Sequence, residues 1–72
     1  MPYTIRQARE LKGLTQEMVG GAINVDQGAV SNWERAVNRT PRKNHKPLAE
    51  LYGVTVDELL AAMDETERER GR

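Results

Sequence analysis

The chain has 72 residues, of which 38% are apolar, and it carries no cysteine and a formal net charge of zero. A chain of this length forms one small domain, because it buries only about 60% of the surface that its unfolded form exposes. The absence of cysteine excludes a disulfide framework and a thiolate metal site. Since no apolar run is long enough for a signal peptide or a membrane span, the sequence predicts a cytoplasmic protein with no membrane contact.

The zero net charge hides an uneven distribution of charge along the chain. Residues 1–47 carry eight Lys and Arg against four acids, whereas residues 48–72 carry three Arg against seven acids. Within the first part, residues 35–46 hold five cations, one histidine and no acid. This pattern predicts a local basic patch on a neutral protein.

The spacing of apolar residues, caps and helix breakers predicts five short helices and no strand. Thr4 is expected to cap the first helix and to form a capping box with Gln7, and Gly13 ends this helix. Thr15 is expected to cap the second helix. Asn24 ends it, because asparagine tolerates the left-handed backbone conformation at a helix end.

The third predicted helix follows Asp26, a favourable N-cap, and turns Val30 and Trp33 inward. Its other side carries amide, hydroxyl and glycine groups: Gln27, Gly28, Ser31 and Asn32. No apolar period continues from Ala36 to Asn44, so this stretch is predicted to be an extended loop.

The fourth predicted helix begins at residue 44 or 45, because Pro47 is tolerated only in a first turn, and it ends at Gly53. Thr55 and Glu58 form a second capping box, which opens the fifth helix.

The predicted fold class is all-α, with one domain over residues 1–63. Residues 64–72 carry many charges but nothing to bury, so they are predicted to form a frayed helix or a disordered tail. The predicted core consists of the apolar residues at inward positions: Ile5, Ala8, Leu11, Leu14, Val19, Ile23, Val25, Val30, Trp33, Leu48, Leu51, Val54, Leu59 and Leu60.

No arrangement typical of catalysis or metal binding is present in the sequence. His45 is the single histidine, and its cationic neighbours disfavour a bound Zn²⁺. Ser31 has no base within one helical turn, and Gly20 and Gly21 lie inside a helical pattern and not in a phosphate-binding loop. The sequence therefore predicts no enzymatic activity, no metal, no cofactor and no small-molecule substrate.

Two helices joined by about three residues, of which the second presents short hydrogen-bonding side chains, can place that second helix in the major groove of DNA. In this region the sequence resembles the phage-repressor helix-turn-helix family, which is Cro- and lambda-repressor-like and is also called the xenobiotic-response-element family. The resemblance spans residues 5–60. It rests on Thr15-Gln16, Val19-Gly20, Val25, Gln27, Val30, residues 31–34 and residues 48–59. It implies a compact five-helix, lambda-repressor-like DNA-binding domain whose second and third helices form the helix-turn-helix.

The sequence departs from this family at several positions. Gly20 stands where the family requires a small residue at a close helix crossing, and Asn24 replaces the turn glycine. Gly20 and Gly21 each cost about 0.8 to 1 kcal/mol relative to alanine, so the second helix is expected to be soft, and Gly21 has no evident role. Ala36 replaces a family glycine, and Pro47 lies within the family's fourth helix, which suggests a rebuilt loop before it.

The resemblance implies a role for each matching position. Residues expected to meet base edges are Gln27, Gly28, Ser31 and Asn32, where Gly28 lets the helix approach closely without reading a base itself. Residues expected to contact the DNA backbone are Thr15, Gln16, Arg35, Asn38, Arg39, Arg42 and Lys43. Gln16 is also expected to brace Gln27. The family often dimerises through its last helix, which makes Leu60 and Met63 the candidate dimer surface.

The resemblance implies a sequence-specific regulator that binds double-stranded DNA, of the kind found as small phage or mobile-element repressors. It would act in the cytoplasm of a bacterial or phage-infected cell, on the nucleoid. Taken alone, outward polar residues and a basic loop are ordinary solvated surfaces. The alternative is therefore a protein-binding module, antirepressor-like or antitoxin-like, that keeps this fold without binding DNA.

Overall fold

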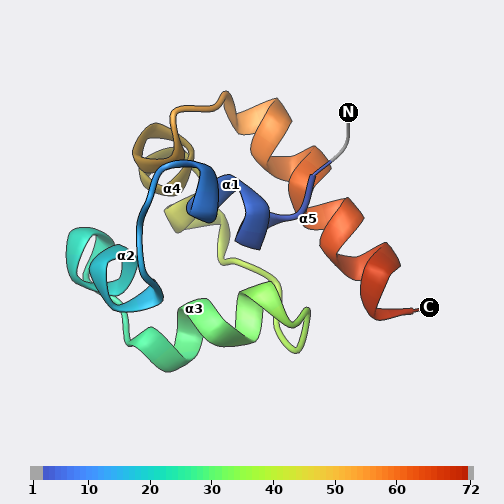
Figure 1. The fold of residues 1–72 in the computed structure, drawn as a ribbon, viewed down its shortest axis with the longest axis horizontal. Coiled ribbons are helices and arrows are strands. Elements are labelled where there is room, and N and C mark those ends of the chain that lie inside the picture. The colour runs from blue at the N-terminus through green and yellow to red at the C-terminus, as the bar shows by residue number, and fades with distance from the viewer. Residues whose placement is uncertain (1–2, 72) are drawn as a thin grey trace.

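The computed structural model describes residues 3–71, which fold into five α-helices and one short 3-10 helix (Figure 1). The elements are α1 (Ile5–Leu11), α2 (Gln16–Ile23), α3 (Gln27–Glu34), η1 (Arg42–Asn44), α4 (His45–Tyr52) and α5 (Val56–Arg70). The described residues contain no strand, so the predicted all-α class is confirmed. Between residues 3 and 71 no helix combines the length and the apolar character needed to cross a membrane.

Threonine caps begin three of the helices, as the sequence predicts. Thr4 and Gln7 form the expected capping box, in which the Gln7 amide donates to Thr4 Oγ1 at 3.1 Å and the Thr4 amide donates to Gln7 Oε1 at 2.9 Å. Thr55 and Glu58 form the second box at the start of α5. Asp26 precedes α3 at the cap position, but its side chain makes no capping hydrogen bond.

The first four α-helices end in the same way. One or two positions after each helix end a residue has positive φ, and these residues are Gly13, Asn24, Ala36 and Gly53. The amide of the following apolar residue then donates back to a carbonyl of the last turn, as from Val25 to Gly20 and from Val37 to Asn32, both at 2.9 Å. These are Schellman-type ends. The left-handed conformation predicted for Asn24 is confirmed, whereas Ala36 pays roughly 1 to 2 kcal/mol for its Cβ atom.

The core lies where the five helices meet. In Figure 1, α1 lies at the centre of the view and the other helices surround it, with α2 against α3 and α4 against α5. The side chains with the least solvent contact are Val19, Val30, Leu48 and Leu59, one from each of the other four helices. Most of the remaining predicted core residues pack around them from partly buried positions.

The core prediction was wrong for Leu11, which is 79% exposed. Ile5 and Ala8 are buried, but Leu11 comes six residues after Ile5, which places the two side chains about 120° apart around the helix axis. The prediction also missed Tyr52 and Met63, which are buried.

Residues 64–70, which were predicted to form a frayed helix or a disordered tail, continue α5 without a break to Arg70. Thr66 is 4% exposed, and its hydroxyl accepts from the Ile5 amide at 3.1 Å and donates to the Ala62 carbonyl at 2.8 Å. The bond to the Ile5 amide attaches the additional turns of α5 to the start of α1, whereas the bond to Ala62 lies within α5. Residue 72 lies outside the described residues, and the limit of the domain at residue 63 stays a prediction.

The two neighbouring glycines of α2 have different surroundings. A Cβ atom on Gly20 would lie 2.7 Å from the Val25 carbonyl oxygen and 3.4 Å from the Gln27 amide nitrogen. Gly20 therefore lets the turn between α2 and α3 pass close to the helix. A Cβ atom on Gly21 would meet nothing within 4 Å, so no close contact requires glycine there.

The two positions should respond to alanine in opposite directions. Gly21→Ala should raise the free energy of unfolding by about 0.8 to 1 kcal/mol, because alanine restricts the unfolded chain and is the better helix former. Gly20→Ala should lower it by about 1 kcal/mol or more, because the turn must move away from the new methyl group. Urea unfolding followed by the fluorescence of Trp33 measures both. Equal stabilisation by the two substitutions would contradict the role given to Gly20.

Candidate nucleic-acid interface

One side of α3 faces away from the molecule and carries the residues predicted to meet base edges. Gln27 and Gly28 are exposed, and Ser31 and Asn32 are half-buried. A Cβ atom on Gly28 would meet nothing within 4 Å, so the helix backbone itself is accessible there. The opposite side of the helix is buried in the core. The four residues therefore lie on one surface, as the sequence predicts.

Asn32 is hydrogen-bonded to a residue predicted to contact the DNA backbone. Arg35 Nη2 donates to Asn32 Oδ1 at 2.6 Å. A bidentate contact with adenine uses both the oxygen and the nitrogen of an asparagine amide, so Arg35 competes with a base for this oxygen. The two predicted roles are thus linked on the same end of α3.

A buried ion pair holds the C-terminal end of α3 against α1. Arg9 Nε and Nη2 donate to the two Glu34 carboxylate oxygens at 2.6 and 3.1 Å, and Arg9 Nη1 donates to the Leu14 carbonyl at 2.7 Å. The side chains are only 11% and 3% exposed. Hydrogen bonding to Glu34 raises the pKa of Arg9, so the guanidinium stays charged. Sequence reasoning missed this pair because its members are 25 positions apart.

Gln16 joins the same cluster from the first turn of α2. Its Nε2 atom donates to Glu34 Oε1 at 3.0 Å. A buried carboxylate needs several donors, and the Gln16 amide supplies one of them, while the expected bracing of Gln27 by Gln16 stays a prediction. Tyr52 lies in the field of this carboxylate, and its pKa is raised well above the usual tyrosine range by burial and by the charge of Glu34.

The extended loop predicted from Ala36 to Asn44 ends in the 3-10 helix η1, inside the basic segment of residues 35–46. Arg42 and Lys43 lie on the 3-10 helix η1, where both are exposed. Thr40 is buried, and its carbonyl oxygen lies 3.0 Å from His45 Nε2. His45 thus fixes the end of the loop. Among residues 3–71, no three His, Cys, Asp or Glu side chains gather as a metal site requires.

A protein-family model described as helix-turn-helix matches residues 5–59, more than half of the chain. The chain belongs to the Cro/C1-type helix-turn-helix family. Over 57 residues it is 33% identical to the HTH-type transcriptional activator BcrR of Enterococcus faecalis. This alignment covers 79% of the chain but only 28% of that relative, so the chain spans little more than a quarter of its length. No solved structure matches the chain.

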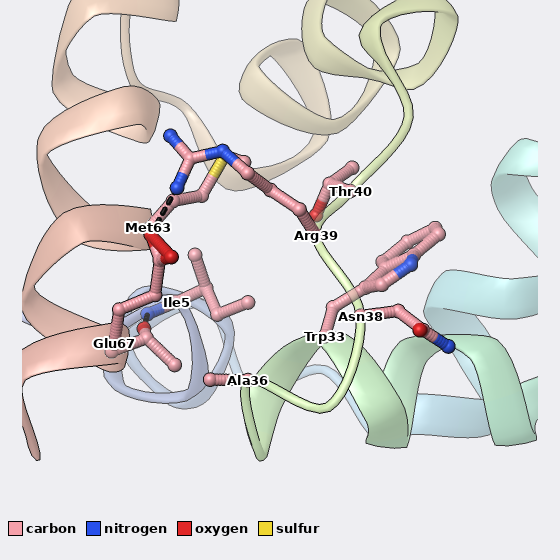
Figure 2. Close-up of a pocket in the computed structure, with 9 residues that line it drawn as sticks. Ile5, Trp33, Ala36, Asn38, Arg39, Thr40, Met63 and Glu67 are labelled. Carbon is pink, nitrogen blue, oxygen red and sulfur yellow. Dashed lines mark hydrogen bonds and ion pairs between the residues drawn. The ribbon is translucent and has the colours of Figure 1, made fainter. Parts of the chain in front are cut away.

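In this helix-turn-helix domain, Arg39 is engaged by acidic side chains of α5. Figure 2 shows Arg39 extending from the loop after α3 towards α5, where it pairs with Glu67, and its second partner is Asp64 at 3.3 Å. The guanidinium is half exposed, so the pairs contribute little to stability. A phosphate would have to compete with two carboxylates for Arg39. Its predicted contact with DNA therefore requires an exchange of partners.

A small cavity separates this loop from α5 (Figure 2). Its volume of about 30 Å³ is enough for one or two water molecules. Met63 lines this cavity and is 3% exposed. Met63 therefore offers no surface to a second chain, and its place in the predicted dimer surface was wrong. Leu60 is half-buried, and its role at a dimer surface stays a prediction.

Removing one member of the buried ion pair should destabilise the domain strongly. Glu34→Gln should lower the free energy of unfolding by about 3 kcal/mol, because it leaves the Arg9 charge buried without a counter-charge. The matched control is Glu10→Gln, which breaks the exposed Arg6–Glu10 pair on α1 and should cost less than about 0.5 kcal/mol. Urea unfolding compares the two variants. Equally small losses would show that the buried pair does not hold α3 in place.

Proposed function

We propose that this chain is a sequence-specific regulator of transcription that places α3 in the major groove of double-stranded DNA. The helix-turn-helix family and the relative named as a transcriptional activator support a DNA-binding transcription regulator. The observation that carries the proposal is the outer side of α3, which presents Gln27, Gly28, Ser31 and Asn32 together on a helix fixed from behind by Arg9 and Glu34.

The chemistry of this surface suits base edges. The amides of Gln27 and Asn32 can each donate and accept at adenine, and a good bidentate pair discriminates against the wrong base by about 1 to 3 kcal/mol. The Ser31 hydroxyl can donate or accept. Gly28 has no side chain, so it lets the backbone of α3 come close to the floor of the groove.

Contacts to phosphates would surround this surface. Thr15 and Gln16 lie at the N-terminus of α2, where unpaired amides and the helix dipole favour an anion. Arg35, Asn38, Arg42 and Lys43 supply further donors from the segment after α3, and Arg39 joins them when it leaves its carboxylate partners. Such contacts fix the register of the protein on DNA but carry no sequence information.

The regulatory outcome that follows most directly from this mode of binding is repression, because a protein seated in the groove blocks a promoter that overlaps its site. We propose this role, of the phage or mobile-element type, in the cytoplasm of a bacterial or phage-infected cell. A dimer formed near Leu60 would read two half-sites about 34 Å apart. BcrR is named an activator, so a reporter gene with the selected site placed over and then upstream of its promoter is needed to test repression.

A protein-binding module that keeps the fold without binding DNA is the second candidate. Two observations favour it: the net charge of zero, and the engagement of Arg39 by the acidic residues of α5. Selection of bound duplexes from a random DNA library separates the two candidates. The regulator enriches a defined sequence, whereas the module enriches none.

Substitutions of base-reading and of phosphate-binding residues should have different effects on binding to the selected duplex. Asn32→Ala should weaken binding by about 1 to 3 kcal/mol and remove the preference at one base position. Arg42→Ala should weaken binding to every duplex alike and lower the slope of log K against log salt by about one. Fluorescence anisotropy at several salt concentrations measures both effects. A uniform loss on all duplexes for Asn32→Ala would contradict its assignment as a base reader.

A further inference from the structure

An open groove runs between the start of α1, the end of α3 and the end of α5, and three arginines line it. Arg6, Arg35 and Arg70 come from these three parts of the fold, and the groove has a volume of about 330 Å³. Two buried threonines, Thr4 and Thr66, also line it. Neither Arg6 nor Arg70 was expected to take part in binding.

The groove is positively charged. Its lining includes the carboxylates of Glu34 and Glu69 as well as the three arginines. Glu34 is already neutralised by Arg9 from behind, which leaves Glu69 as the carboxylate that opposes three guanidiniums. Arg6 is also shared with Glu10 at 3.4 Å, but both side chains of that pair are more than half exposed, so it is weak and exchangeable.

The groove is continuous with the surface proposed to read bases. Arg6 and Arg35 also line a neighbouring hollow of about 400 Å³, together with Gln16 and Ser31. Arg70 is held at the other end of the groove by donating from Nη1 to the Ala36 carbonyl, directly beyond α3. A strand that passes Gln16 and Ser31 would therefore meet Arg6 and Arg35 first and Arg70 next.

We propose that Arg70, with Arg6 and Arg35, binds a phosphate of the DNA strand beside the bases read by α3. The proposal rests on the proposed function and extends its surface to the last turn of α5. A guanidinium matches the geometry of a phosphate and keeps its charge under all ordinary conditions. The last turns of α5 thus have two roles. Asp64 and Glu67 pair with Arg39, and Arg70 supplies a cation in the groove beside the end of α3.

Arg68 provides the matched control on the same helix. It is paired with Glu65, and two residues of α-helix place it about 200° from Arg70, outside the lining of the groove. Arg68→Ala therefore removes the same charge from the same helix without changing the groove.

The experiment measures binding of the full chain to its selected duplex over a range of salt concentrations. Arg70→Ala and Arg6→Ala should each make the fall of log K with log salt shallower by about 0.9. The loss of affinity relative to the wild type should therefore be about eightfold larger at 0.1 M salt than at 1 M. Arg68→Ala should change the slope little, and Arg70→Lys should retain most of it. Urea unfolding of each variant accounts for any loss of folded protein.

Two results would overturn this inference while leaving the proposed function intact. The first is a selected duplex bound by the wild type with equal slopes for the Arg70→Ala and Arg68→Ala variants. The second is a loss of affinity for Arg70→Ala at an unchanged slope, which would mean that Arg70 only supports the Ala36 carbonyl. A wild-type chain that binds no duplex would instead reject the proposed function itself.

Discussion

The position of α3 depends on the buried pair between Arg9 and Glu34. An isolated helix of eight residues is not stable in water, and α3 buries only Val30 and Trp33 fully. The pair supplies a directional contact that apolar packing cannot, because the two guanidinium bonds define both the distance and the angle between α1 and the end of α3. Gln16 adds the first turn of α2 to the same carboxylate.

The ion pair between Arg9 and Glu34 sets the orientation of α3 more than it adds to the free energy of unfolding. Desolvating two charges offsets much of their attraction, so a buried pair contributes little net free energy although its loss is costly. Its consequence is geometric: three helices share one carboxylate, and the outward side of α3 keeps a single orientation. Gly20 acts on the same geometry from the other end, because it lets the Val25 carbonyl approach α2 closely.

Local sequence signals were sufficient to predict most of the fold. Capping boxes at Thr4 and Thr55 depend on residues three positions apart, and a left-handed end at Asn24 depends on one residue, so each can be read without the fold. The outward side of α3 followed from helical periodicity. The contacts that could not be predicted join distant positions. They are the ion pair between Arg9 and Glu34, the hydrogen bond from the Ile5 amide to the Thr66 hydroxyl, and the ion pairs of Arg39 with acidic residues of α5.

The last turns of α5 illustrate the limit of composition as a guide. Residues 64–70 were expected to form a frayed helix or a disordered tail because they have nothing to bury, yet Thr66 bonds them to α1. The bond to α1 fixes the place of the charged side chains on this part of α5. Asp64 and Glu67 form ion pairs with Arg39, and Arg70 donates to the Ala36 carbonyl just after α3. The net charge of zero therefore says little about which surface attracts an anion.

The central claim is that the outer side of α3 is a surface for DNA. An NMR titration of the chain with its selected duplex, followed through backbone amide shifts, tests this most directly. The account predicts that the large shifts fall on residues 27–32 and on the surrounding residues 15–16 and 35–43, with smaller ones elsewhere. Shifts that leave α3 unchanged, or no shifts at low salt, would contradict it.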